Sequence, residues 1–179
     1  MADNVATFMW TMRALYAGLC LVIVYLHLLP LDTVPRGWAG PDIVLALTFA
    51  WVLRRPEYVP PLLIAMVLLL CDLLFHRPPG LWAALVLIAS QTLRGQTREL
   101  RDMTFSVEWF SVATTLVAIT IAYRVTLAIL LIDQAPLGLS LMQMVMTLVA
   151  YPLVVIVSQA LFGVRRLAPG DVDPMGGRT

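Results

Sequence analysis

Few side chains in this chain of 179 residues are of a type that performs catalysis or binds metals. The two histidines, His27 and His76, are both expected at the outer ends of helices, and neither an H-E-x-x-H zinc motif nor a G-x-x-x-x-G-K-S/T phosphate-binding loop is present. An intramembrane protease would need a nucleophile facing a histidine base, and no Cys–His cluster offers one. We therefore predict a protein that is not an enzyme and has no cofactor and no metal.

The sulfur-containing residues indicate packing. Cys20 and Cys71 fall within apolar stretches, where free, buried cysteines are expected, and they imply no disulfide framework. The alternation of Met142, Met144 and Met146 indicates helix packing or lipid contact. The chain has 12 basic and 11 acidic residues, and its positive charge is too thinly spread to predict a nucleic-acid partner.

Three ionisable residues in or beside apolar stretches are the candidate site: Asp42, Asp72 and Arg124. An unpaired charge at the centre of a bilayer costs about 2.5–3.5 kcal/mol, so we expect Arg124 to pair with Asp72 or with Asp42. One interpretation is an interhelical clamp without a ligand. The other is a polar site for a transported solute, an ion or a lipid, or a contact with a partner protein.

Long apolar stretches must position these residues. The chain is 60% hydrophobic, which a soluble domain of this length could not cover with polar groups. A bilayer can accommodate it, provided that the backbone closes its hydrogen bonds within helices. We therefore predict an all-α polytopic membrane protein with about six transmembrane helices. They form a single transmembrane domain over residues 1–167, with helices at about 9–31, 38–53, 59–75, 80–93, 105–132 and 137–164.

The second, third and fourth of these stretches are shorter than the roughly 20 residues that a spanning helix needs. A five-span alternative makes one of them re-entrant, which requires its ends to be buried in protein. Pro41 followed by Asp42 predicts the start of the second helix, because a carboxylate suits the positive end of the helix dipole. Pro79 and Gly80 predict a tight turn before the fourth helix.

All twelve basic residues are arginines. If the N-terminus is inside and six helices cross, nine arginines fall on inner segments, and three fall on outer segments: Arg36, Arg77 and Arg124. This bias follows the positive-inside rule and predicts that both termini are cytoplasmic. Residues 168–179, rich in proline, glycine and aspartate, are predicted to be a disordered cytoplasmic tail.

The inner face is predicted to carry two arginine groups. Arg54 and Arg55 follow the second helix, and Arg94, Arg98 and Arg101 belong to the longest inner loop. The last three would share one face if that segment is helical, because their spacing is four and three. That face is either an anchor at the lipid headgroups or a docking surface for a cytoplasmic partner.

Two segments resemble a known family. Residues 39–42, Ala-Gly-Pro-Asp, followed by an apolar run and two arginines, resemble the start of the second helix in the rod shape-determining protein MreD family. Residues 61–94 resemble the most recognisable segment of that family, in which an apolar helix ends in an aspartate and a short turn leads to a second helix with a basic end. Asp72 takes the aspartate position, Pro79-Gly80 the turn, and Arg94 the basic end.

The resemblance implies a non-enzymatic scaffold of the bacterial elongasome in the inner membrane, supporting rod shape and lateral peptidoglycan synthesis. It implies direct binding of a single-span MreC-like protein. Indirect partners are an MreB-like filament, a RodA-like glycosyltransferase and a class B penicillin-binding transpeptidase. It further implies a fold similar to the substrate-binding subunits of energy-coupling-factor transporters. The alternative is a small-solute transporter or its binding subunit, with Trp38, Trp82 and Tyr123 as candidates to line a cavity.

Overall fold

The computed structural model describes residues 2–29, 38–100 and 104–164. Within these ranges the chain forms six α-helices and one short 3-10 helix, and the predicted all-α class is confirmed. Arg101 and the predicted tail 168–179 lie outside the described residues. The elements are α1 (Ala2–Leu28), α2 (Ile43–Arg54), η1 (Pro56–Tyr58), α3 (Pro61–Leu74), α4 (Leu81–Leu100), α5 (Phe105–Ile129) and α6 (Leu137–Phe162).

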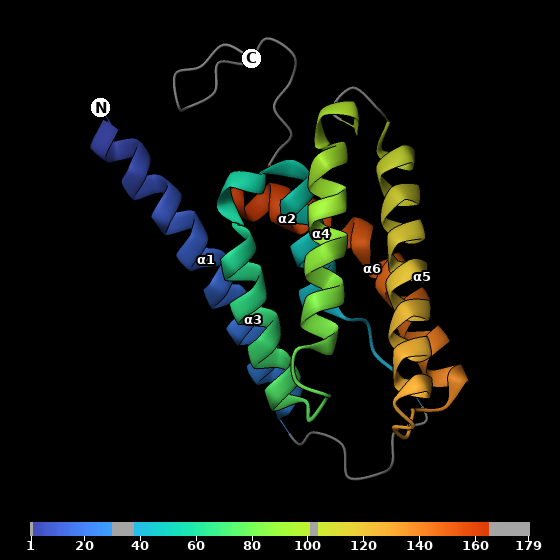
Figure 1. The fold of residues 1–179 in the computed structure, drawn as a ribbon. Coiled ribbons are helices and arrows are strands. Elements are labelled where there is room, and N and C mark those ends of the chain that lie inside the picture. Colours follow the sequence, from blue (N-terminus) through green and yellow to red (C-terminus); the bar gives the residue numbers. More distant parts are fainter. Residues whose placement is uncertain (1, 30–37, 101–103, 165–179) are drawn as a thin grey trace.

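The helices run alternately between two ends of one bundle (Figure 1). The start of α1, the short helix η1, the end of α4 and the end of α6 lie at one end, which we call the η1 end. The connections from α3 to α4 and from α5 to α6 lie at the opposite end, which we call the turn end. The first and last described helices therefore begin and finish on the same side.

The short helix α2 forms the centre of the bundle. Every residue from Val44 to Arg54 is buried, and α2 packs against α6, α4 and α1. A helix that is apolar all round needs such complete cover. Trp51 is fully buried within a ring of aromatic side chains, and its indole Nε1 donates to the Ser158 hydroxyl of α6 at 3.2 Å.

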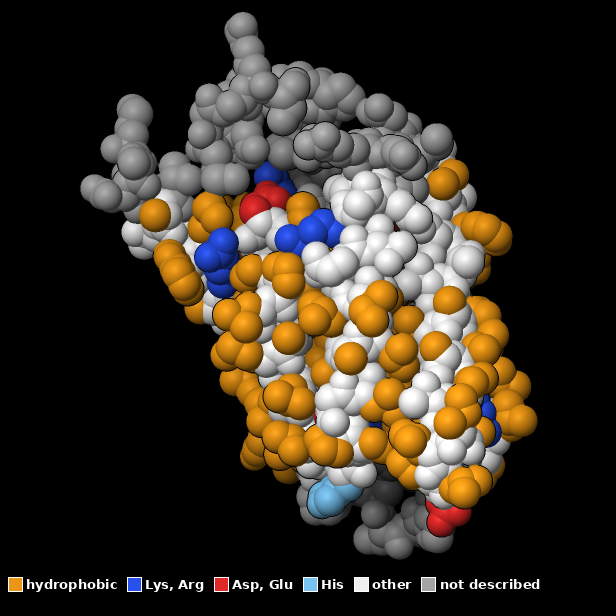
Figure 2. All heavy atoms as spheres, in the orientation of Figure 1, with side chains coloured by type: hydrophobic (Ala, Val, Ile, Leu, Met, Phe, Trp, Pro, Cys, Tyr) orange, Lys and Arg blue, Asp and Glu red, His pale blue; other side chains and the backbone are white. Residues whose placement is uncertain are grey.

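Three helices are long and apolar enough to cross a membrane. They are α5, α6 and the part of α1 from Ala6 to Leu28. Helices α2 and α3 are apolar but shorter. Hydrophobic side chains cover the central part of the face in Figure 2, whereas histidine and acidic side chains appear toward its ends. Many hydrophobic side chains of the protein are well exposed, including Leu62 on α3 and Val149 on α6. This surface is consistent with a helical membrane protein.

Helix boundaries depart from the predicted ones where local hydrogen bonds decide them. The second helix begins at Ile43 because the Asp42 carboxylate caps it by accepting a hydrogen bond from the Leu45 N–H at 3.0 Å, so Pro41 lies one residue before the cap. The fourth helix continues to Leu100, beyond the predicted end at residue 93. Arg94 and Arg98 therefore lie on a helix and not in a loop.

Pro152 interrupts the backbone hydrogen-bond ladder of α6. Because proline has no N–H, the carbonyl of Leu148, four residues earlier, loses its donor within the helix. The indole Nε1 of Trp109 in α5 donates to this carbonyl at 3.1 Å. The hydrogen bond that α6 lacks at Leu148 is thus supplied by a side chain of α5.

We predict that Trp109→Phe lowers the free energy of unfolding by about 0.5–1.5 kcal/mol, because it removes this donor and keeps an aromatic ring. In a Pro152→Ala background the loss should be smaller, since the new N–H of residue 152 can bond to Leu148. Thermal unfolding of the purified variants in detergent measures both values. Trp10→Phe, at a side chain that is 68% exposed, is the control and should change little. Equal losses in the two backgrounds would contradict this role.

Candidate functional site

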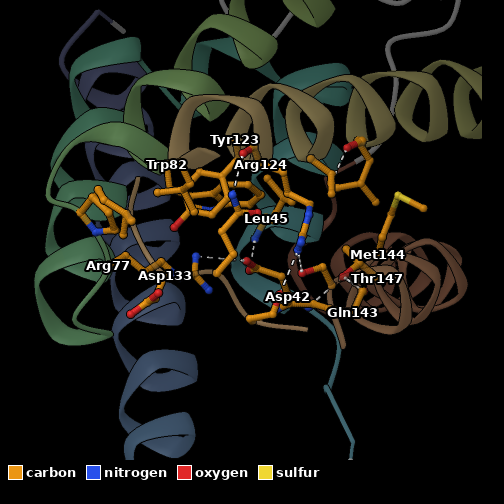
Figure 3. Close-up of a pocket in the computed structure, with 18 of the residues that line it drawn as sticks. Asp42, Leu45, Arg77, Trp82, Tyr123, Arg124, Asp133, Gln143, Met144 and Thr147 are labelled. Carbon is orange, nitrogen blue, oxygen red and sulfur yellow. Dashed lines mark hydrogen bonds and ion pairs between the residues drawn. The ribbon is translucent and has the colours of Figure 1, made fainter. Parts of the chain in front are cut away.

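A cavity of about 380 Å³ opens at the turn end, among the first residues of α2, α4 and α6 and the last turns of α5 (Figure 3). We call it the turn-end cavity. Four charged side chains line it, together with three rings: Asp42, Asp133, Arg77, Arg124, Trp82, Tyr123 and His76. Two of the three predicted site residues, Asp42 and Arg124, thus contribute to one cavity, and Asp72 does not line it.

Asp42 joins the start of α2 to α6 and to the turn after α3. Its Oδ1 caps α2, and its Oδ2 lies 4.0 Å from Nη1 of Arg77. Its backbone N–H donates to the Thr147 hydroxyl at 2.9 Å, and this hydroxyl donates to the Gln143 carbonyl at 2.7 Å. Both carboxylate oxygens of Asp42 are therefore engaged by the protein itself.

Arg124 is half-buried near the end of α5. Its Nη1 donates to the Ala135 carbonyl at 3.1 Å and to the Ser140 hydroxyl at 2.8 Å. The expected ion pair with Asp72 or Asp42 is wrong: in the described part of the chain, Arg124 forms no salt bridge within 4.0 Å. The connection between α5 and α6 supplies the Ala135 carbonyl, and the first turn of α6 supplies the Ser140 hydroxyl, so two neutral oxygens contact the guanidinium.

Asp72 is fully buried and closes the turn between α3 and α4. Its Oδ2 accepts hydrogen bonds from the backbone N–H groups of Gly80 and Ala83, at 3.0 and 3.1 Å. These donors belong to the start of α4, where helical N–H groups lack partners within the helix. Gly80 has a φ of 86°, a left-handed conformation that suits glycine, and the exposed Pro79 precedes it. For Asp72, this geometry is an interhelical clamp.

Aromatic side chains form one wall of the turn-end cavity. The rings of Trp82 and Tyr123 meet edge to face, with centroids 5.1 Å apart. The guanidinium of Arg77 lies 5.4 Å from the Trp82 ring centroid, a cation–π distance. Trp82 and Tyr123 therefore line a cavity, as considered for the transporter alternative, whereas Trp38 does not line this one and is 60% exposed.

A second buried charge cluster, at the η1 end, was missed in the sequence. The Arg54 guanidinium donates to both carboxylate oxygens of Glu108 in α5, with Nη2 3.2 Å from Oε2, and the Tyr151 hydroxyl of α6 also donates to Glu108. Glu108 is fully buried, and Arg54 nearly so. A signal was available, because Glu108 is the single acidic residue in the apolar stretch 105–132. Such a carboxylate requires a buried cationic partner.

The other arginines at the η1 end hold the segment around η1 in place. Arg13 donates from α1 to the Glu57 carbonyl at 3.4 Å, and Arg55 pairs with the Glu57 carboxylate at 3.2 Å. Arg94 donates from α4 to the Val59 carbonyl. These side chains reach back to the protein, so Arg55 and Arg94 are partly engaged and are not simply free for lipid or a partner.

In the described ranges, no group of three His, Cys, Asp or Glu side chains is placed to hold a metal ion. His27 packs edge to face on Phe75, with ring centroids 5.1 Å apart.

Comparison with protein-family models, curated proteins and solved structures finds no match to this chain. The geometry itself offers a ligand-sized cavity with four charged side chains at the turn end, and at the η1 end a buried Arg54–Glu108 pair that borders a second cavity, of about 480 Å³.

We predict that Asp72→Asn is milder than Asp72→Leu. Both backbone N–H groups bond to one oxygen, and the asparagine carbonyl can accept both, whereas leucine leaves two buried donors unsatisfied at about 1–3 kcal/mol each. Accumulation in membranes and the melting temperature in detergent measure the difference. Asp133→Leu, at an exposed position, is the matched control. Equal, wild-type values for both Asp72 variants would refute the clamp.

We predict that Glu108→Leu lowers the free energy of unfolding by about 3–5 kcal/mol, because it leaves the Arg54 charge buried without this partner. Adding Arg54→Met should recover much of that loss, since the remaining groups are apolar. Unfolding midpoints of the two single variants and the double variant test this. Glu57→Leu, which breaks a half-buried pair, should cost no more than about 1 kcal/mol. A double variant less stable than both single variants would contradict it.

Proposed function

We propose that the protein is a non-enzymatic scaffold of the bacterial elongasome that binds an MreC-like single-span protein and supports rod shape and lateral peptidoglycan synthesis. The observation that carries the proposal is the α3–α4 hairpin. Residues 61–94, which resemble the MreD family, fold as two helices joined by a short turn, and the Asp72 carboxylate at the family's aspartate position locks that turn. These hydrogen bonds offer a physical reason for an aspartate at this position of the motif: it holds the turn between the two helices.

The proposed setting is the inner membrane, with six spans and both termini in the cytoplasm. The start of α1 and the end of α6 lie at one end of the bundle, and arginines 13, 54, 55 and 94 are at that same end, which agrees with the positive-inside rule. Under this arrangement the turn end faces the periplasm. An MreB-like filament, a RodA-like glycosyltransferase and a class B transpeptidase would be linked indirectly.

Partner binding would take place within the membrane. Between helices in lipid there is little hydrophobic driving force, so affinity must come from close packing and interhelical hydrogen bonds. The outward faces of α5 and α6 carry exposed aliphatic side chains over their whole length, for example Ile121, Val125, Val149 and Leu153. These faces could receive a partner's single helix without any change in the buried centre of the bundle.

The turn-end cavity favours a second candidate, the binding subunit of a solute transporter. Its volume of about 380 Å³ lies within the range of small-ligand sites, and Trp82 and Tyr123 offer stacking surfaces. An arrangement similar to the substrate-binding subunits of energy-coupling-factor transporters would suit this function also. Such a subunit would be found with a pair of ATPases and not with cell-wall synthases.

The experiment is to tag the C-terminus, extract native membranes in mild detergent, and identify the co-purified proteins by mass spectrometry. We expect a single-span periplasmic coiled-coil protein together with cell-wall synthases. An equally tagged, unrelated multi-helix membrane protein is the control for non-specific recovery. Recovery of the chain alone, or with an ATPase pair, would reject the scaffold function, and the ATPase pair would support the transporter subunit.

A further inference from the structure

One edge of the Arg124 guanidinium is not used by the fold. Both hydrogen bonds of this side chain leave from Nη1, to Ala135 and Ser140, and its Nε and Nη2 bond to no described residue. The Nε–Nη2 edge presents two parallel N–H groups, the geometry that binds phosphate and carboxylate groups in a bidentate manner. Arg124 lines the turn-end cavity.

Arg124 also forms no salt bridge with the described residues. Its two acceptors are a neutral carbonyl and a neutral hydroxyl, and the nearby carboxylate of Asp42 is engaged by the Leu45 N–H and lies closest to Arg77. A half-buried cation in an apolar bundle is costly unless an anion compensates it. The position is therefore prepared for a negative charge from outside the fold.

Two further hydrogen-bonding groups share the cavity with Arg124. Tyr123 and Gln143 both line it, and no hydrogen bond joins the Tyr123 hydroxyl or the Gln143 side-chain amide to the described part of the chain. Together with the guanidinium edge, they supply donors from α5 and α6. The remaining acidic residue in the lining, Asp133, is exposed.

We infer that the turn-end cavity binds an anionic group of phosphate or carboxylate chemistry, held by the Nε–Nη2 edge of Arg124 with Tyr123 and Gln143 as additional donors. A lipid headgroup and a small soluble anion share this chemistry. The aromatic pair Trp82–Tyr123 stands beside the site, as aromatic side chains do at the level of lipid headgroups. This binding does not depend on the elongasome partner, and it adds a ligand to either candidate function.

The first test uses the purified full-length protein in mixed micelles of phosphatidylglycerol and phosphatidylcholine, with retained lipid counted by native mass spectrometry. We expect bound phosphatidylglycerol in the wild type and about a tenfold lower occupancy in Arg124→Gln, the loss typical of a charge-assisted pair. Arg13→Gln, which replaces an arginine at the η1 end, is the matched control and should retain wild-type occupancy.

The second test adds inorganic phosphate to lipid-depleted protein and follows the melting temperature. A rise in the wild type that is absent in Arg124→Gln supports the site and identifies a soluble anion as its source. If the Arg124 variant does not fold, Asp133→Asn still tests the site. Removing this carboxylate from the lining should strengthen anion binding about two- to fivefold. The proposal is overturned if the wild type responds in neither test, if Arg124→Gln responds like the wild type, or if Asp133→Asn weakens binding.

Discussion

The central position of α2 requires that the polar groups at both of its ends be satisfied inside the protein. The residues of α2 from Val44 to Arg54 are buried, and an unsatisfied polar group at such a position is expensive. At the end of α2, Arg54 therefore meets Glu108 of α5 and, through it, Tyr151 of α6. At its start, Asp42 caps the helix and bonds to Thr147 of α6. The positions of α5 and α6 follow from these two requirements.

The elements that the sequence predicted well are those set by short-range chemistry. Proline, glycine and aspartate marked the start of α2 and the turn before α4, because capping and positive φ act within a few residues. The partners of the charged residues were not predictable in this way. Arg54 and Glu108 are 54 residues apart, and Arg124 finds Ser140 because of how the connection after α5 folds back. Hydropathy shows that a charged residue lies within an apolar stretch, but it does not identify the residue with which that charge pairs.

The two ends of the bundle use arginine differently. At the η1 end the guanidinium groups reach back to carboxylates and to the carbonyls of Glu57 and Val59, so their main effect is to fix a connection. At the turn end, only Nη1 of Arg124 bonds to described residues, Ala135 and Ser140, and Arg124 lines the turn-end cavity. Composition alone treats these arginines as equivalent. Their hydrogen bonds distinguish arginines that contact the segment around η1 from an arginine that lines the turn-end cavity.

The shortness of α2 has an electrical consequence. Its 12 residues span about 18 Å, whereas the hydrocarbon layer of a bilayer is about 30 Å thick. If the bundle spans a membrane, polar groups at the two ends of α2 are separated by less low-dielectric material than any neighbouring lipid provides. A transmembrane voltage would then fall more steeply along α2 than across the surrounding bilayer. The charged side chains at its two ends, Asp42 and Arg54, would lie within that steeper field.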